Sequence, residues 1–205
     1  DFVVKWLKEF EIGEDIKIEL NETGDAYLPK IKKGNRFTHL ASEGTGKVKL
    51  VFLILNIANS FFPEEVPSHS FYYNSGMASA MHGDYFPNIL IIEEPEAFLH
   101  PNYQSKLADL FVDAAGCWAR KSDDINLGSM FIIETHSEYL IRKLQLLKAK
   151  GVLDEVSLYY FGKKESWNID IEDNGSLSRP FGKGFFDEAD EIATELFYNV
   201  HNKFN

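Results

Sequence analysis

Two acidic residues follow an apolar run in residues 88–96, "NILIIEEPE". Glu93 and Glu94 are therefore expected at the carboxyl end of a strand, the edge of open α/β sheets where ligands bind. Adjacent carboxylates there are costly unless they hold a cation or join a network. In a phosphoryl-transfer site, the first would hold Mg²⁺ and the second would polarise the attacking water. A charged turn after a strand is the structural alternative.

A second apolar run ends in the same way in "MFIIETHS", residues 130–137. His136 beside the first strand's acids could hydrogen-bond a terminal phosphate or its attacking water. A single histidine is more often a packed or capping residue, and Ser137 is a candidate N-cap for the next helix. The other histidines, His69, His82 and His201 among them, do not have the spacing of a zinc site.

Residues 42–49, "SEGTGKVK", contain glycines and a lysine like those of a phosphate-binding loop. A Walker A loop, G-x-x-x-x-G-K-[ST], needs an early glycine for its turn and a final hydroxyl for magnesium. If Gly46 and Lys47 are the GK pair, those two positions hold Ala41 and Val48. The spacing therefore argues against a P-loop. A turn before a helix, with glycines that only relax the backbone, is a competing interpretation.

The elements that would position these residues alternate between strand and helix patterns. Alternation or short apolar runs predict strands near residues 16–20, 27–31, 89–92, 130–133 and 156–161. Helical spacing predicts helices near residues 48–58, 107–118, 140–147 and 186–200, and the opening "DFVVKWLKEF" looks like the middle of a helix. The run at 89–92 fits a strand buried on both faces of a parallel sheet. Residues 167–178 predict a hairpin with a type I′ turn at Asn174 and Gly175.

This alternation predicts an α/β protein whose central, mainly parallel sheet is flanked by helices. A single domain over residues 1–205 is the simplest division, since the chain has no internal repeat. Residues 62–87 have three prolines, many aromatic residues and no periodicity. We expect a long ordered loop or lid there.

Composition narrows the function classes. The 205 residues are 44% hydrophobic, enough for one sizeable core, and the net charge is −11, which excludes a broad basic surface for nucleic acid. The single cysteine, Cys117, permits no internal disulfide and favours a reducing, cytoplasmic location. The longest apolar run, residues 50–55, is too short to span a bilayer, so no membrane partner is expected.

The first residue is not Met, so we expect a fragment of a longer protein.

The order of the motifs is distinctive. "SEGT" precedes an apolar helix, then come "ILIIEEPEAFLHPNYQSKLADL" and "FIIETHSEYLIRKLQ". This order resembles the C-terminal half of ATPases of the ATP-binding-cassette (ABC) type. It most resembles the stand-alone bacterial AAA/OLD-like branch, which is related to SMC ATPase heads and found among DNA-repair and anti-phage defence proteins. The tail "GFFDEADEIATELF" resembles the end of one uncharacterised group in that branch.

The resemblance implies a role for particular positions. Ser42, Glu43 and Gly44 match the signature motif, which in this superfamily touches the γ-phosphate of ATP held by the partner subunit. Glu93 matches the Walker B acid that serves Mg²⁺, at a position where the superfamily often has Asp. Glu94 matches the catalytic base.

Two further motifs match. Residues 97–101, with Leu99 and His100, match the D-loop, which crosses the dimer interface, and His136 matches the switch histidine of catalysis. The Walker A motif and the Q-loop are missing and are expected upstream of residue 1, so this segment alone is expected to be inactive. The "GTGK" of residues 44–47 also departs from the Gly-Gly-Gln ending of transporter signatures.

The resemblance thus implies a P-loop NTPase fold of ABC-ATPase type, with a C-terminal β-hairpin and helix and with the N-terminal (Walker A) half absent. It implies an ATP-binding and ATP-hydrolysing head with ATP and Mg²⁺ as cofactors, a homodimer formed through an ATP sandwich, and a DNA-linked or nuclease-linked task. Two alternatives stay open. One is a catalytically incomplete module that docks a partner such as a nuclease, and the other is a small P-loop kinase or GTPase that uses Lys47.

Overall fold

The computed structural model describes residues 1–61, 89–119 and 130–201. The predicted lid at 62–87, with His69 and His82, lies outside these residues. The chain forms two compact units, Asp1–His136 and Ser137–Asn205. The single-domain division stays a prediction, and each unit is described by itself.

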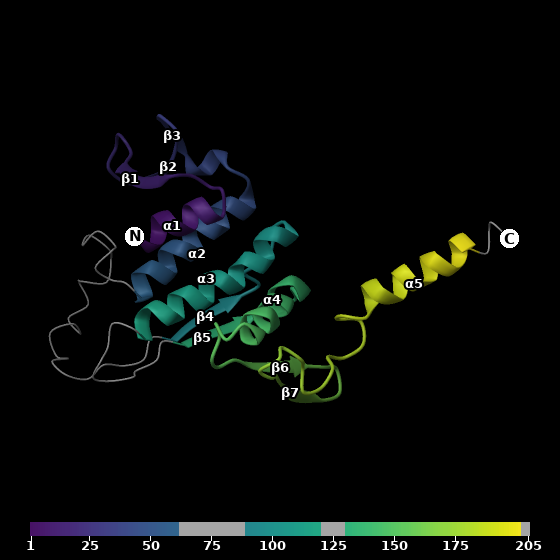
Figure 1. Ribbon diagram of the computed structural model, residues 1–205. Coiled ribbons are helices and arrows are strands. Elements are labelled where there is room, and N and C mark those ends of the chain that lie inside the picture. Colours follow the sequence, from purple (N-terminus) through teal and green to yellow (C-terminus); the bar gives the residue numbers. More distant parts are fainter. Residues whose placement is uncertain (62–88, 120–129, 202–205) are drawn as a thin grey trace. The chain divides into compact units, whose positions relative to one another are not determined.

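The first unit contains three helices, a short 3₁₀ turn and five strands among its described residues. In chain order they are α1 (Phe2–Glu9), β1 (Asp15–Leu20), β2 (Tyr27–Lys33), β3 (Arg36–His39), η1 (Leu40–Ser42), α2 (Thr45–Phe61), β4 (Ile89–Glu93), α3 (Pro101–Ala119) and β5 (Met130–Glu134) (Figure 1). The second unit contains α4 (Glu138–Ala149), β6 (Ser157–Phe161), β7 (Ser166–Asp170) and α5 (Glu188–His201).

Within this chain α1 is capped by the Asp1 carboxylate, which accepts a hydrogen bond from the Val4 amide at 3.2 Å. Whether the helix extends further upstream stays a prediction. The apolar side of α1 is buried, and the Trp6 indole N–H donates to Asp113 of α3 at 2.9 Å. This bond and the contacts with α2 join α1 to the helices that carry the site.

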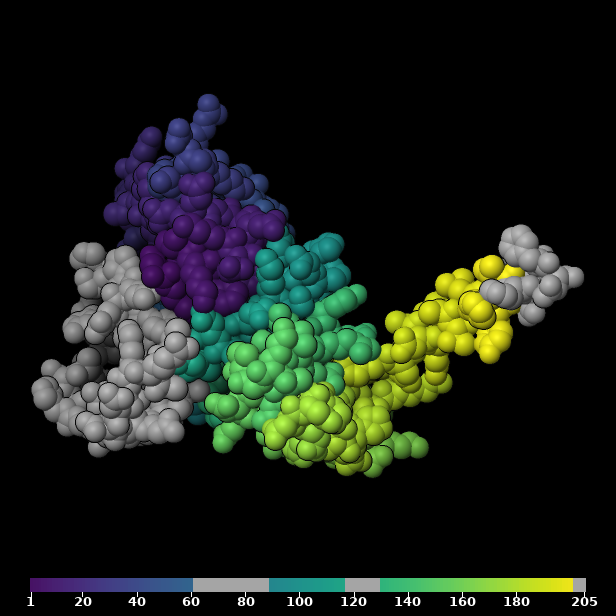
Figure 2. Space-filling model, viewed as in Figure 1, coloured from purple at the N-terminus to yellow at the C-terminus, as the bar shows by residue number. Residues whose placement is uncertain are grey.

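Strands β1, β2 and β3 form an antiparallel sheet in sequence order. The first two were predicted, but β3 was not, because its four residues are too few to show a clear alternation. Gly34, at φ +57°, supplies the left-handed turn between β2 and β3. Figure 2 shows α1 and this sheet as one continuous purple and blue surface.

Strands β4 and β5 pair in parallel, with Glu93 opposite Glu134. This pairing and the helices between the strands confirm the α/β fold. The expectation that β4 is buried on both faces was wrong. Phe131 of β5 packs on Phe111 of α3 at a ring distance of 5.1 Å. On the opposite face the apolar side chains are exposed, namely Ile89, Ile91, Met130 and Ile132.

In the second unit, the Ser137 hydroxyl accepts from the Leu140 amide at 3.2 Å, which confirms the predicted N-cap of α4. Strands β6 and β7 form an antiparallel hairpin. The hairpin predicted at 167–178 is limited to the end of β7 and a single antiparallel bridge between Ile171 and Leu177. The turn at Glu172–Ser176 is not type I′, since only Gly175 has a positive φ, +84°. Its hydrogen bonds, Gly175 N–H to Glu172 and Glu172 N–H to Ser176, are those of a type I turn followed by a glycine bulge. In the described part of the chain, no helix combines the length and apolar character needed to cross a membrane.

Candidate functional site

The parallel pair brings acidic residues from two strands to one edge. Strand β4 ends at Glu93 and β5 at Glu134, and the Glu94 amide then donates to the Glu134 carbonyl at 2.9 Å. Glu94 itself has φ +44°, a left-handed conformation that few non-glycine residues adopt. The regular strand therefore stops at Glu93, and the backbone turns sharply at Glu94. Outliers of this kind cluster at functional sites.

Glu94 and His136, the two predicted catalytic residues, face each other. The His136 Nε2 lies 3.9 Å from the Glu94 Oε1, and the side chains are 74% and 54% exposed, respectively. This separation is longer than a hydrogen bond. The two groups therefore share one solvent-accessible space without being locked together, as a base and a second polar group around a reacting water would need.

Glu93 presents its carboxylate at the same edge. It is exposed and makes no hydrogen bond or ion pair with the residues that the structure describes. Among those residues, no group of three or more His, Cys, Asp or Glu side chains is placed to hold a metal ion. Mg²⁺ in nucleotide sites takes one or two protein carboxylates and completes its shell with phosphate and water, so a free Glu93 fits that ion.

The predicted D-loop forms two successive turns. The Ala97 amide donates to the Glu94 carbonyl at 3.1 Å, and the Leu99 amide donates to the Glu96 carbonyl at 3.0 Å. Leu99 is buried, so its side chain anchors the turn and does not face an interface. His100 is exposed, and its carbonyl accepts from the Tyr103 amide at the start of α3.

Phe98 is strongly exposed in this turn. Its side chain is 78% exposed, and its φ is +67°. Sequence analysis did not single it out, although an aromatic residue inside a predicted interface loop was a usable signal. Phe98, His100 and Pro101 are therefore the exposed D-loop residues that an approaching subunit could contact.

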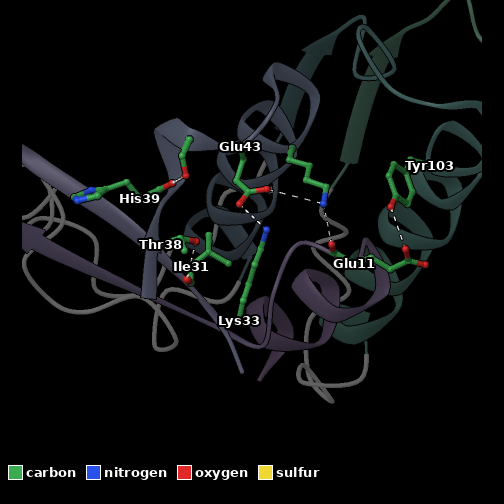
Figure 3. A network of polar contacts seen from close by, with 9 residues as sticks. Glu11, Ile31, Lys33, Thr38, His39, Glu43 and Tyr103 are labelled. Atoms are coloured by element: carbon green, nitrogen blue, oxygen red, sulfur yellow. Dashed lines mark hydrogen bonds and ion pairs between the residues drawn. The ribbon is translucent and has the colours of Figure 1, made fainter. Parts of the chain in front are cut away.

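The predicted signature residues lie between β3 and α2. The Ser42 hydroxyl donates to the His39 carbonyl at 2.6 Å, which closes the 3₁₀ turn (Figure 3). The Glu43 carboxylate is 12% exposed and lies 2.5 Å from the Lys33 ammonium and 4.0 Å from that of Lys47. Gly44 is exposed, with no atom within 4 Å of where a Cβ would stand. The three residues are thus adjacent. Ser42 and Gly44 are exposed, whereas the Glu43 carboxylate is engaged by lysines.

Lys47 belongs to the same polar network. Its ammonium donates to the Glu11 carbonyl at 3.1 Å, and Tyr103 donates to the Glu11 carboxylate at 3.4 Å (Figure 3). Burial and the Glu11 carboxylate raise the pKa of Tyr103, which keeps its phenol protonated as the donor. Lys47 thus joins α2 to the segment after α1, an internal role that does not favour the P-loop interpretation.

The first two turns of α2 also contact the segment that begins at Glu94. The Lys49 ammonium donates to the Glu94 carbonyl at 2.5 Å. Gly46 packs so closely on this segment that an added Cβ would lie under 3.0 Å from the Phe98 carbonyl oxygen and 3.1 Å from the Leu99 side chain. The signature segment (residues 42–44) and the loop that begins at Glu94, the predicted base, are therefore joined through α2. Sequence analysis did not assign these contacts, and residue spacing carries no signal for them.

Comparison with known families places the site in context. Residues 4–141, more than half of the chain, match the AAA ATPase domain family. Residues 153–196, which include most of the predicted tail motif, match a family described as protein of unknown function (DUF3696). The first match begins at residue 4 and gives no support to the expectation that the N-terminal half of the ATPase is absent.

Comparison with individual proteins gives less information than comparison with families. No curated protein matches the chain. One similar solved structure comes from work on the structural biochemistry of ATP-driven dimerization and DNA-stimulated activation of SMC ATPases. It is 12% identical, with a TM-score of 0.43, over 95% of this chain and 96% of that chain.

Proposed function

Because the chain belongs to the AAA ATPase domain family, we propose that it is part of an ATPase that binds ATP with Mg²⁺ and hydrolyses it at the edge of β4 and β5. The observation that carries the proposal is the 3.9 Å separation of the Glu94 and His136 side chains, at an edge where the exposed Glu93 carboxylate has no partner among the described residues. A nucleophilic water needs a base and an orienting group within reach, and two neighbouring strand ends supply both.

Each residue then has a separate task. Glu94 accepts the proton of the attacking water, and His136 hydrogen-bonds that water or the terminal phosphate. Glu93 supplies an oxygen ligand to Mg²⁺, which would neutralise charge on the phosphates when it is bound. Glu94 is well exposed, so a bound nucleotide or a second subunit must exclude bulk water before hydrolysis is efficient.

A second subunit fits the exposed signature segment. Gly44 precedes α2, whose first amide groups lack partners within the helix and therefore favour anions. Its open surroundings would let the backbone approach a phosphate held by another copy. Together with Phe98 and His100, this supports a homodimer closed over ATP. The resemblance of the motifs supports a DNA-linked or nuclease-linked task for the ATPase, in repair or phage defence.

Glu94→Gln in the intact protein tests the catalytic assignment. Removing a general base typically lowers turnover about 10²- to 10⁴-fold, whereas ATP binding should persist because the amide keeps the size of the side chain. Glu134→Gln is the matched control, since Glu134 is at the same edge and has no assigned role. The assignment is wrong if Glu94→Gln turns over ATP at the wild-type rate, or if the control loses as much.

ATP-dependent association tests the dimer. Light scattering of the Glu94→Gln protein should show a doubled mass with ATP and Mg²⁺ and the monomer mass without nucleotide. A monomer at saturating ATP would contradict the proposed dimer. The catalytic assignment would still be tested separately by the turnover assay.

A further inference from the structure

Glu96 is a buried carboxylate between the loops that follow β4 and β5. It is 8% exposed, and its Oε1 accepts a hydrogen bond from the His136 backbone N–H at 2.6 Å. Its Oε2 is buried and has no hydrogen-bond partner in the described part of the chain. Burying a carboxylate with one unsatisfied oxygen is costly, so the residue needs an explanation beyond packing.

The hydrogen bond that the Glu96 carboxylate accepts lies next to the catalytic pair. Glu96 is two residues after Glu94, and it holds the backbone of His136, 40 residues farther along the chain. The imidazole of His136 is 74% exposed, so little packing restrains it. The position of the imidazole relative to Glu94 is therefore set mainly by the His136 backbone, which is hydrogen-bonded to Glu96. A charge-assisted bond of this length is among the stronger ones in proteins.

We propose that Glu96 is a positioning residue, which fixes the backbone of His136 and so holds its imidazole opposite the Glu94 carboxylate. The consequence for turnover rests on the proposed function, whereas the geometric part does not. A displacement of about 1 Å at a reacting group can cost about 10²-fold in rate, so loss of this bond should be visible in kcat.

Three substitutions separate the bond from the bulk of the side chain. Glu96→Gln keeps the length and an acceptor oxygen for the His136 amide. Glu96→Asp keeps the charge but is one methylene too short to reach it. Glu96→Ala removes the acceptor altogether. If the bond matters, the glutamine protein should resemble wild type, and the other two proteins should resemble each other.

The geometric part is tested by NMR of the intact protein with ¹³C-labelled histidine, in which the His136 ring signal is assigned by its loss in His136→Asn. Glu94→Gln removes a charge next to that ring and should shift its signal in the wild-type and Glu96→Gln backgrounds. The shift should be much smaller in the Glu96→Asp and Glu96→Ala backgrounds. An equal shift in all four backgrounds, or none in wild type, would overturn the proposal.

The catalytic part is tested by a double-mutant cycle on ATP turnover. Glu96→Ala should lower kcat about 10²-fold with little change in the KM for ATP, and it should cost nothing further when His136→Ala is already present. Equal losses in both backgrounds would show a purely structural role and overturn the proposal. If Glu94→Gln and His136→Ala leave turnover unchanged, the proposed function fails, and the NMR measurement still decides the role of Glu96. Glu96→Asp replaces the alanine variant if that protein does not fold.

Discussion

Gly46 offers a test of the contact between α2 and the D-loop. Its φ is not in the left-handed region, so alanine fits the backbone, and only the surrounding space opposes it. The added Cβ would lie under 3.0 Å from the Phe98 carbonyl oxygen. A carbonyl cannot rotate away as a side chain end can, so either α2 or the loop must shift.

Two opposing terms set the size of the effect. Alanine in place of glycine favours a helix by at most about 1 kcal/mol, and less in a first turn. Overpacking a close contact costs about 1–3 kcal/mol. We therefore expect Gly46→Ala to destabilise the protein by about 1–2 kcal/mol. In a chain of this length, each kcal/mol lowers Tm by about 2–4 °C.

Gly44→Ala is the matched control, since nothing lies within 4 Å of the position of its Cβ. Its stability should stay within about 0.5 kcal/mol of wild type, while ATP-dependent association should weaken if Gly44 approaches a phosphate. Urea unfolding followed by tryptophan fluorescence, to which buried Trp6 contributes, measures the stability of both proteins. A Gly46→Ala protein as stable as wild type would refute the packing argument, as would equal destabilisation by Gly44→Ala.

Two further predictions concern lysine contacts. Lys49→Met keeps most of the side chain but removes the exposed bond to the Glu94 carbonyl, so it should cost about 0.5–1.5 kcal/mol in urea unfolding and lower kcat. Unchanged values in both assays would contradict this prediction. Hydrogen bonds from Lys17 and Lys30 lower the pKa of Glu19 from 4.5 to about 2. Because the folded pKa of Glu19 lies below the unfolded one, its contacts with the two lysines stabilise the protein above about pH 4.5, and this contribution is lost as the pH falls toward 2. Glu19→Gln should therefore flatten the decline in urea midpoint over that interval.

Local patterns were sufficient for the strands and helices that carry the site. The apolar runs before Glu93 and Glu134 predicted strands, and their acidic ends predicted a shared edge, because parallel strands place their carboxyl ends together. Helix α2 followed from its apolar spacing, and Ser137 from the chemistry of N-caps. Each of these predictions depends on residues only a few positions apart.

Contacts between distant segments could not be predicted in this way. The bond from Glu96 to His136 joins residues 40 apart, and that from Lys49 to Glu94 joins residues 45 apart. Nothing in "EPE" indicates that its last carboxylate is buried. Gly46 likewise seemed only to relax the backbone, whereas its missing side chain allows a loop more than 50 residues away to pack on α2.

The network around Glu43 changes what the signature segment can do. A free carboxylate facing another subunit's γ-phosphate would repel it, but Glu43 is 12% exposed and lies near the ammonium groups of Lys33 and Lys47. Its charge is balanced within the fold, and its side chain serves the shape of the segment. Any contact with a second chain's nucleotide must therefore come from the backbone at Gly44 and from a Ser42 oxygen whose hydrogen already goes to His39.

This arrangement has a consequence for how nucleotide binding would be sensed. Through Lys47, Gly46 and Lys49, α2 contacts the segment after α1, the D-loop and the carbonyl of Glu94. A phosphate that draws Gly44 toward another subunit would move α2, and α2 cannot move far without carrying the loop that holds Glu94. Under the proposed function, closure of the dimer and alignment of Glu94 would therefore be one motion, and hydrolysis before closure would be slow.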